Sequence, residues 1–249
     1  MGLHLEAGTL WDGTKDIRPG MPYGTRPRLL LLHLIRTYLH THHRTIDLSM
    51  TLRHFMTQTL SIDASGGERG GGTSFNEQLR ALAACRLWIG YAAASATSRV
   101  QSADGWVSVF EDFAVETKKS DPRTPWRKTI TLSREFVATL RESAVPLDIR
   151  ALRGIQDSAL SLDVYAWLAH RLHRLEHSVV LHWASLRGQF AHEYDDKKAF
   201  KRNFKKSMHD VLTVYPQASV RPVFGGYLLL PSPAPVGVLE KDEAFAAMR

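Results

Sequence analysis

The sequence contains one cysteine, Cys85, and lacks a long uninterrupted apolar run. A single cysteine cannot form an intrachain disulfide, which is typical of proteins in a reducing compartment. The most apolar segment, residues 29–39, is interrupted by His33 and Arg36 and is shorter than the roughly 20 residues that span a bilayer. The first residues show no basic start followed by an apolar block, the pattern of a secretory signal. We therefore expect a globular protein of the cytoplasm that does not contact a membrane.

Acidic residues are absent from the first ten residues of one strongly basic segment, and this segment says most about the partner of the protein. Lys and Arg number 32 against 25 Asp and Glu, which leaves a formal net charge of +7. Such a surplus favours an anionic partner, above all a nucleic acid. The surplus is densest in KKAFKRNFKKSMHDVL, residues 197–212, where six of the first ten residues are basic and none is acidic.

This segment also carries an apolar stripe with helical spacing. At 100° per residue, Phe200, Phe204 and Val211 fall within a narrow arc, and Met208 and Leu212 extend it on one side. The stripe predicts a helix that packs on a core with one face. Asp195 or Asp196 precedes it and can serve as the N-cap.

The opposite face of the same helix is basic. A charged helix face is usually only solvated, but the missing acidic residues remove the Glu–Lys pairs that solvated helices commonly carry. A basic helix after a short helix, a capped turn and before a hairpin fits the DNA major groove, where Arg pairs with guanine and Asn with adenine. Arg202 and Asn203 are the candidate base readers. The remaining candidate contacts on this helix are Lys197, Lys198, Lys201, Lys205, Lys206 and His209.

The order of elements predicted for the first half ends in a hairpin. We expect a helix over 28–42 with Leu31, Leu34, Ile35, Tyr38 and Leu39 on its buried face. A strand (45–48), a helix capped by Ser49 (50–60), a flexible turn (65–72), a helix and two strands (106–113 and 127–133) follow. The helix after the turn has capping-box spacing at Ser74 and Glu77, and Phe75, Leu79, Leu82 and Ile89 on one face.

A similar order recurs in the second half. Helices are predicted over 149–156, 160–173, 183–190 and 197–212, with a strand over 178–182 and a closing hairpin hinged at Gly225 and Gly226. The repeated order predicts an α+β fold of two tandem winged helix-turn-helix modules, mainly helical with small β-hairpin wings. We place them at 26–145 and 146–233, between a flexible N-terminal arm (1–25) and a flexible tail (234–249).

One motif suggests a different class of protein. His173, Glu176 and His177 match the H-x-x-E-H pattern of a class of zinc peptidases. With 12 histidines in the chain, a chance match is a strong competing explanation, and the helix would have to continue into the β-branched residues of SVV. We therefore expect neither a metal, a cofactor nor catalysis. A zinc-dependent peptidase is kept as an alternative.

Seven segments of the sequence carry a family resemblance: MPYGTRPRLLLLHLI, SGGERGGGTSFNEQLRALAACR, PWRKTITLSREFVATL, VPLDIRALRGI, SALSLDVYAWLAHRL, FKRNFKKSMHDVLTVYP and LLLPSP. They resemble plasmid replication initiators of the RepA type. The resemblance is collinear over residues 21–233. It implies a protein of the bacterial cytoplasm that binds double-stranded DNA repeats at a plasmid origin. Such a protein helps to open the duplex and recruits the host replication initiator and helicase.

The resemblance also implies contacts in the first module. The basic helix of the second module would be the main DNA reader, and Arg69, Ser74, Asn76 and Arg80 are further contact candidates. A helix-turn-helix transcriptional repressor would use the same contacts and is the alternative function. The sequence leaves open whether the protein acts as a monomer or a homodimer.

Overall fold

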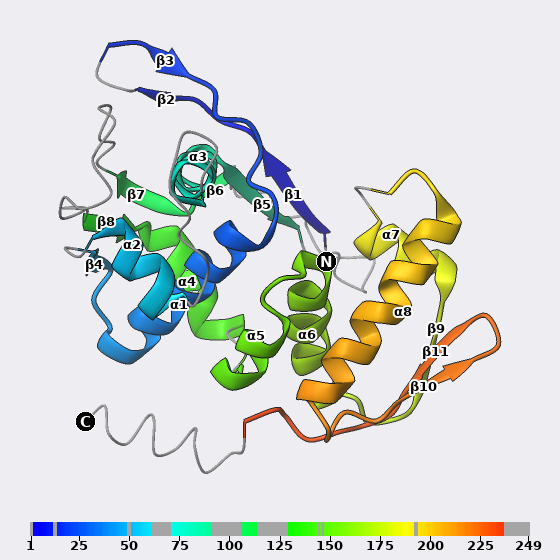
Figure 1. Cartoon of the computed structure of the whole chain (residues 1–249). Coiled ribbons are helices and arrows are strands. Elements are labelled where there is room, and N and C mark those ends of the chain that lie inside the picture. The colour runs from blue at the N-terminus through cyan, green and yellow to red at the C-terminus, as the bar shows by residue number, and fades with distance from the viewer. Residues whose placement is uncertain are drawn as a thin grey trace, which may run out of the picture. The chain divides into compact units, whose positions relative to one another are not determined.

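The computed structural model describes residues 2–11, 14–48, 51–60, 71–90, 106–113, 129–143, 145, 147–191 and 194–236. It is an α+β structure, in agreement with the predicted class, and its sheets are small and antiparallel (Figure 1). Two compact units divide the chain, Met1–Ala144 and Val145–Arg249. The division falls one residue before the predicted module boundary.

Unit 1 contains helices and three small sheets. Its helices are α1 (Thr25–Thr41), α2 (Leu52–His54), the π-helix η1 (Phe55–Thr59), α3 (Gly71–Ala84) and α4 (Arg134–Ser143). Its strands are β1 (Gly2–Glu6), β2 (Leu10–Trp11), β3 (Asp16–Ile17), β4 (Thr45–Asp47), β5 (Arg86–Gly90), β6 (Trp106–Ser108), β7 (Phe110–Phe113) and β8 (Thr129–Leu132). They form the sheets β1-β5-β6 and β4-β8-β7 and the hairpin β2-β3.

The first helix forms where the sequence predicts it, but its buried face is rotated. α1 starts at Thr25 and buries Leu29, Leu30, Leu34 and Tyr38. The predicted face residues Leu31, Ile35 and Leu39 are only half-buried. Because this helix is apolar around much of its circumference, its periodicity indicates a helix more clearly than it selects the side that meets the core.

The N-terminal residues form strands, which corrects the predicted flexible arm. β1 pairs antiparallel with β5, with Gly2 opposite Gly90 and Glu6 opposite Arg86. Figure 1 shows β2 and β3 following as a short ribbon. The partner of β1 lies far along the chain, and so the pairing leaves no signal in the local sequence that could predict it.

α3 corrects the predicted capping box. The helix begins at Gly71, so Ser74 lies within it and does not cap it, and Ile89 lies in β5 instead of continuing the helical face. Gly72 is helical although glycine disfavours helices by roughly 1 kcal/mol. A Cβ on Gly72 would make an ordinary van der Waals contact with Leu52 Cδ2, at 3.6 Å, so the packing does not require glycine at this position. The helix α2, which precedes α3 in the chain, is capped by Thr51, and the predicted cap Ser49 lies outside the described residues.

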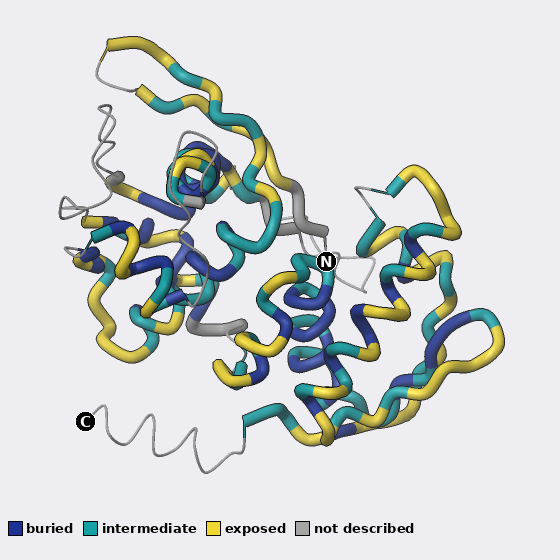
Figure 2. Tube along the Cα trace, in the orientation of Figure 1, coloured by how far each residue is buried: buried dark blue, intermediate teal, exposed yellow. Residues whose placement is uncertain are grey.

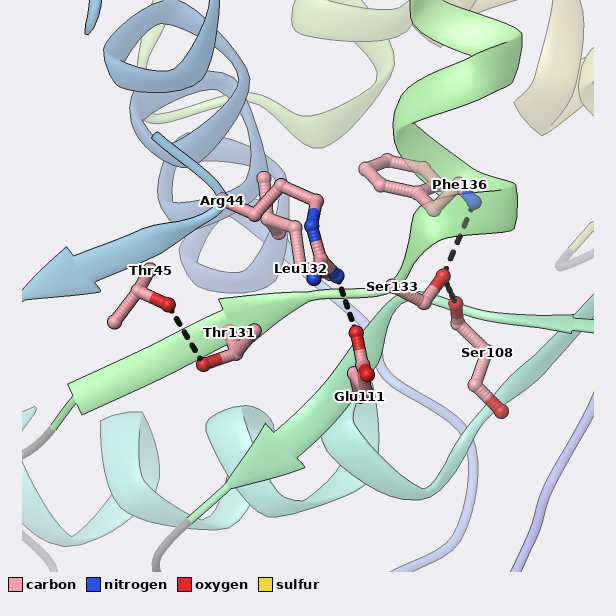
Figure 3. Close-up of polar contacts among 8 residues, drawn as sticks. All are labelled: Arg44, Thr45, Ser108, Glu111, Thr131, Leu132, Ser133 and Phe136. Carbon is pink, nitrogen blue, oxygen red and sulfur yellow. Dashed lines mark hydrogen bonds and ion pairs between the residues drawn. The ribbon is translucent and has the colours of Figure 1, made fainter. Parts of the chain in front are cut away.

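The predicted strand over 106–113 is divided between two sheets. β6 pairs with β5, whereas β7 pairs with β8, and Val109 between them is fully buried. Ser133 holds this crossing: its N–H donates to Val109 O (3.0 Å) and its Oγ donates to Ser108 O (2.6 Å). Figure 3 shows Ser133 Oγ between Ser108 and Phe136. Ser133 Oγ accepts a hydrogen bond from the Phe136 N–H at the start of α4.

Polar contacts also join the strands of the sheet β4-β8-β7. Arg44 forms an ion pair with Glu111 and donates to Leu132 O (2.9 Å), and the hydroxyls of Thr45 and Thr131 are 3.2 Å apart (Figure 3). The Arg44 guanidinium holds the pKa of Glu111 below its ordinary value. These contacts connect Arg44, just before β4, to β7 and to the end of β8.

Unit 2 follows its predicted order closely. Its elements are α5 (Ile149–Ile155), α6 (Ala159–Leu172), β9 (Val179–His182), α7 (Trp183–Phe190), α8 (Lys197–Val214), β10 (Val220–Val223) and β11 (Gly226–Leu229). The sheet order is β10-β11-β9. α6 and α8 pack together and contribute most of the core, including Tyr165, Leu168, Phe204 and Val211 (Figure 2).

Two predicted segments lie wholly or partly outside the described residues. They are the turn at 65–72, of which only Gly71 and Gly72 are described, and the tail at 234–249, which is described only to residue 236. Within the described part of the chain, no helix is both long and apolar enough to cross a membrane.

Candidate nucleic-acid interface

The start of α8 is defined by an N-cap. The Asp196 carboxylate accepts hydrogen bonds from the backbone N–H groups of Lys198 (2.8 Å) and Ala199 (3.1 Å). These donors lack partners within the helix, so the cap satisfies them and stabilises the first turn. Of the two predicted caps, Asp196 is the one used.

The apolar face of α8 is buried as the stripe predicts. Phe200, Phe204, Met208 and Val211 are almost completely inaccessible, and Ser207 is buried with them. Leu212, predicted at the edge of the stripe, is half-buried. The helix is thus attached to its unit through one side, and the orientation of its other side is set by that packing.

An aromatic cluster holds α8 against α7 and the hairpin. We define it as Trp183, Phe190, Tyr194, Phe200, Phe204 and Tyr227. The Trp183 ring lies edge-on to Phe200, Phe204 and Tyr227, with centroids 6.5, 6.0 and 5.6 Å away. Such edge-to-face pairs add about 0.5–1.5 kcal/mol each beyond burial. Sequence reasoning found Phe200 and Phe204 but missed the others, whose spacing along the chain has no single period.

The opposite face of α8 is exposed and cationic. Every predicted contact residue on the helix is exposed except Asn203, which is half-buried; the exposed ones are Lys197, Lys198, Lys201, Arg202, Lys205, Lys206 and His209. Buried and exposed stretches alternate along α8 in Figure 2. The structure therefore brings eight of the twelve predicted site residues together on one helix of about 27 Å, at about 1.5 Å per residue.

Three of these side chains already have partners in unit 2. Lys206 pairs with Asp210 (2.9 Å), and Lys201 Nζ lies 5.4 Å from the Trp183 ring centre. Asn203 Nδ2 donates to Tyr194 Oη at 3.4 Å, so it would have to release that contact to read a base.

Four exposed cations of α8 are not neutralised by the fold. Among the described residues, the side chains of Lys197, Lys198, Arg202 and Lys205 have no hydrogen bond or ion pair. A folded protein gains nothing from keeping four like charges unpaired on one helix, because neighbouring like charges repel one another. The arrangement is suited to a polyanion, with Arg202 as the unpaired group that can form two parallel hydrogen bonds.

The predicted contacts of unit 1 lie in a different setting. Ser74 Oγ accepts a hydrogen bond from Arg26 Nη1 (2.8 Å), so it is used to join α3 to the start of α1. Asn76 and Arg80 are half-buried, and Arg69 lies outside the described residues. The neighbouring Gln78 is buried and accepts from the Tyr23 N–H (2.7 Å).

The residues of the zinc-peptidase pattern do not share a helix face. α6 ends at Leu172, and His173 caps it with Nδ1 2.7 Å from Ala169 O. Glu176 and His177 follow outside the helix and are exposed. Where the structure is described, no group of three or more His, Cys, Asp or Glu side chains could hold a metal.

Cys85 is a packing residue. It is completely buried just after α3, and burial raises the pKa of its thiol to about 11. A thiol that stays protonated at neutral pH is a poor nucleophile.

Comparison with known proteins gives a similar fold and a family. The crystal structure of RctB domains 2-3 has a similar fold, with a TM-score of 0.50 at 10% sequence identity, covering 90% of this chain and 88% of that chain. The family model described as "Plasmid encoded RepA protein" matches residues 21–184. The chain belongs to this family, as its sequence resemblance predicts. No curated protein matches it.

The family match ends before α8 begins. The functional assignment of α8 therefore depends on its own geometry and charge.

Proposed function

We propose that this protein is a plasmid replication initiator of the bacterial cytoplasm that binds double-stranded DNA repeats at the plasmid origin. The exposed, unpaired cationic face of α8 is the observation that carries the DNA-binding part of the proposal. Membership of the plasmid-encoded RepA family supports the replication part. On this proposal the protein also recruits the host replication initiator and helicase.

We further propose that each unit is a winged helix-turn-helix module. In unit 2 the order α6, β9, α7, α8 and β10-β11 is accompanied by the sheet order β10-β11-β9. Unit 1 has a matching series, α1, β4, α2 with η1, α3 and β7-β8, with the sheet order β4-β8-β7. In both, the strand after the first helix pairs with the last strand of the hairpin. The sheet β1-β5-β6 is an addition to this plan in unit 1.

Within unit 2, α8 occupies the place of a recognition helix. Arg202 is suited to pair bidentately with the O6 and N7 atoms of guanine, and each such pair discriminates by about 1–3 kcal/mol. Lys197, Lys198 and Lys205 contact phosphates, which fixes the position of the helix without reading sequence. The cationic face thus supplies both affinity and one point of direct readout.

Origin opening, on this proposal, is driven by binding energy. A protein that bends or untwists its site transfers part of its contact energy into deforming the duplex, most easily at flexible pyrimidine–purine steps. This mechanism requires no hydrolysis, and accordingly we assign no catalytic residue.

The test uses DNA selected by the wild-type protein from a random pool. Replacing Arg202 and Lys206 together by Ala should lower the discrimination between the selected and a scrambled duplex by at least about 1–3 kcal/mol, the amount that one bidentate guanine contact supplies. Fluorescence anisotropy measures the affinity for both duplexes. Arg153→Ala is the matched control, because Arg153 is an exposed arginine of the same unit on α5. Unchanged discrimination by the double variant would refute the assignment of α8.

A transcriptional repressor remains the alternative function, since it would use the same helix. A plasmid that lacks its replication gene, supplied with this protein and the cognate repeats, separates the two. Replication in a permissive host supports the initiator, and repression of a reporter without replication supports the repressor. For the zinc peptidase, stoichiometric zinc in the purified protein would be the finding in its favour.

A further inference from the structure

The turn of the β10-β11 hairpin carries an aromatic side chain that does not pack in the core. Phe224 occupies the turn and has a relative exposure of 104%, the highest among the exposed large apolar residues of the described chain. Val223 beside it is 37% exposed. Figure 1 shows the hairpin projecting beyond the helices of its unit.

The turn presents Phe224 in a fixed way. Val223 pairs with Gly226, which leaves Phe224 and Gly225 as a two-residue turn, and Gly225 has φ of +84°. The N–H of Trp183 donates to Gly225 O (2.9 Å). Gly226 packs so closely on β9 that a Cβ there would lie 1.8 Å from Leu181 O. These contacts hold the base of the turn, so the ring of Phe224 remains outside.

Trp183 connects this turn to α8. Its backbone binds Gly225, and its ring packs on Phe200 and Phe204 of the helix. The turn and the cationic face are therefore parts of one packed body. The position of Phe224 relative to α8 is thus set by packed contacts and not by a flexible loop.

The chemistry around Phe224 favours a polyanion over a protein surface of mixed charge. Arg221 is exposed on β10, and the sequence has no acidic residue between Asp210 and Glu240. An apolar ring with a nearby cation and no carboxylates matches the side chains that wedge between base steps from the minor groove.

We propose that Phe224 is an apolar wedge that enters the minor groove of the duplex held by α8, partly unstacks one base step and kinks the DNA. This inference rests on the proposed function, because it requires α8 to bind DNA. It adds a specific device for duplex deformation: the phenyl ring replaces a base–base stacking contact with a base–phenyl contact.

The experiment compares Phe224→Ser with Phe224→Leu on the selected duplex. Bending is measured by energy transfer between dyes at the duplex ends, and unstacking by the fluorescence of 2-aminopurine scanned across the site. Phe224→Ser should lose the bend and the fluorescence increase, with roughly 5- to 150-fold weaker binding, the range typical of losing one stacked aromatic. Phe224→Leu should retain most of both signals, since leucine also serves as a wedge.

Trp11→Ser is the matched control, because Trp11 is an exposed aromatic on β2 of unit 1. A wild-type protein that binds no duplex would refute the proposed function itself. Wild-type binding with a bend that Phe224→Ser leaves unchanged would overturn the wedge alone. Equal loss of specific binding by the serine and leucine variants would also overturn it, because it would assign Phe224 to structure instead of stacking.

Discussion

In the proposed two-module plan α3 and α8 occupy equivalent places, yet the polar faces of the two helices are used differently. On α3, Ser74 and Gln78 bind Arg26 and the backbone of Tyr23, and the helix is joined to the N-terminal part of its own unit. On α8, four cations have no partner among the described side chains. The comparison teaches that a polar helix face is evidence of ligand binding only when the fold leaves it unpaired. Unit 2 is therefore the main reader in our proposal.

The largest expected effect tests the separation of the two faces of α8. Phe204→Ala removes the centre of the aromatic cluster and should lower the free energy of unfolding by about 3–5 kcal/mol. Lys205→Ala, the adjacent exposed position, should change it by less than about 0.5 kcal/mol. Urea denaturation followed by tryptophan fluorescence measures both. Similar losses in the two variants would show that the faces are not separate.

The next prediction compares the phosphate contacts proposed for α8 with those that α3 could make. The logarithm of the binding constant falls linearly with the logarithm of the salt concentration, and the steepness of this line should decrease by about 0.9 for each phosphate contact removed. The double variant Lys198→Ala/Lys205→Ala should therefore decrease it by about 1.8. Sequence preference should persist, because these residues do not read bases. Arg80→Ala on α3 should change the slope less than either lysine. An equal change for Arg80 would make the two units equal partners in binding.

A smaller effect concerns the structural use of α3. The Ser74–Arg26 hydrogen bond has a charged donor and should contribute about 1.5–3 kcal/mol to stability. A double-mutant cycle with Ser74→Ala and Arg26→Ala isolates this coupling. DNA affinity should be unchanged in Ser74→Ala. A weaker affinity with unchanged stability would instead place Ser74 at the DNA.

The last prediction concerns Cys85, just after α3, whose pH-dependent effect is absent at neutral pH and develops only at high pH. Because the pKa of this thiol is raised to about 11, its contribution to stability is complete below its ordinary pKa and is lost as the pH rises toward about 11. The unfolded chain ionises first, which favours unfolding. Denaturation of the wild type and of Cys85→Ala between pH 8 and about 11 measures the difference. A constant difference across this range would contradict the burial of the thiol.

Much of unit 2 could be predicted because its signals are local. α7 has its predicted bounds, and the N-cap, stripe and cationic face of α8 all lie within about 20 successive residues. The fold of unit 1 was harder to predict, because its strand pairings join segments that are distant in the sequence. Residues 106–113 look like one strand, but the two halves join different sheets, a choice made by partners elsewhere in the chain.

The candidate site shows the same division. Periodicity placed Lys198, Arg202, Lys206 and His209 opposite Phe200 and Phe204. In the structure these four side chains are exposed and both Phe side chains are buried. Periodicity could not show that Asn203 contacts Tyr194, nor that Lys206 forms an ion pair with Asp210, because side-chain partners depend on packing.

The sequence alone determined the two-faced helix, its cap and the surplus of cations, since these depend on residues within a few turns of one another. Only the tertiary structure decided which cations stay unpaired, where the N-terminal strand pairs and how the hairpin presents Phe224. Those outcomes depend on contacts between distant segments: β1 with β5, and the Trp183 N–H with Gly225 O. Such contacts form because they satisfy backbone groups and fill the core, and no local pattern records them.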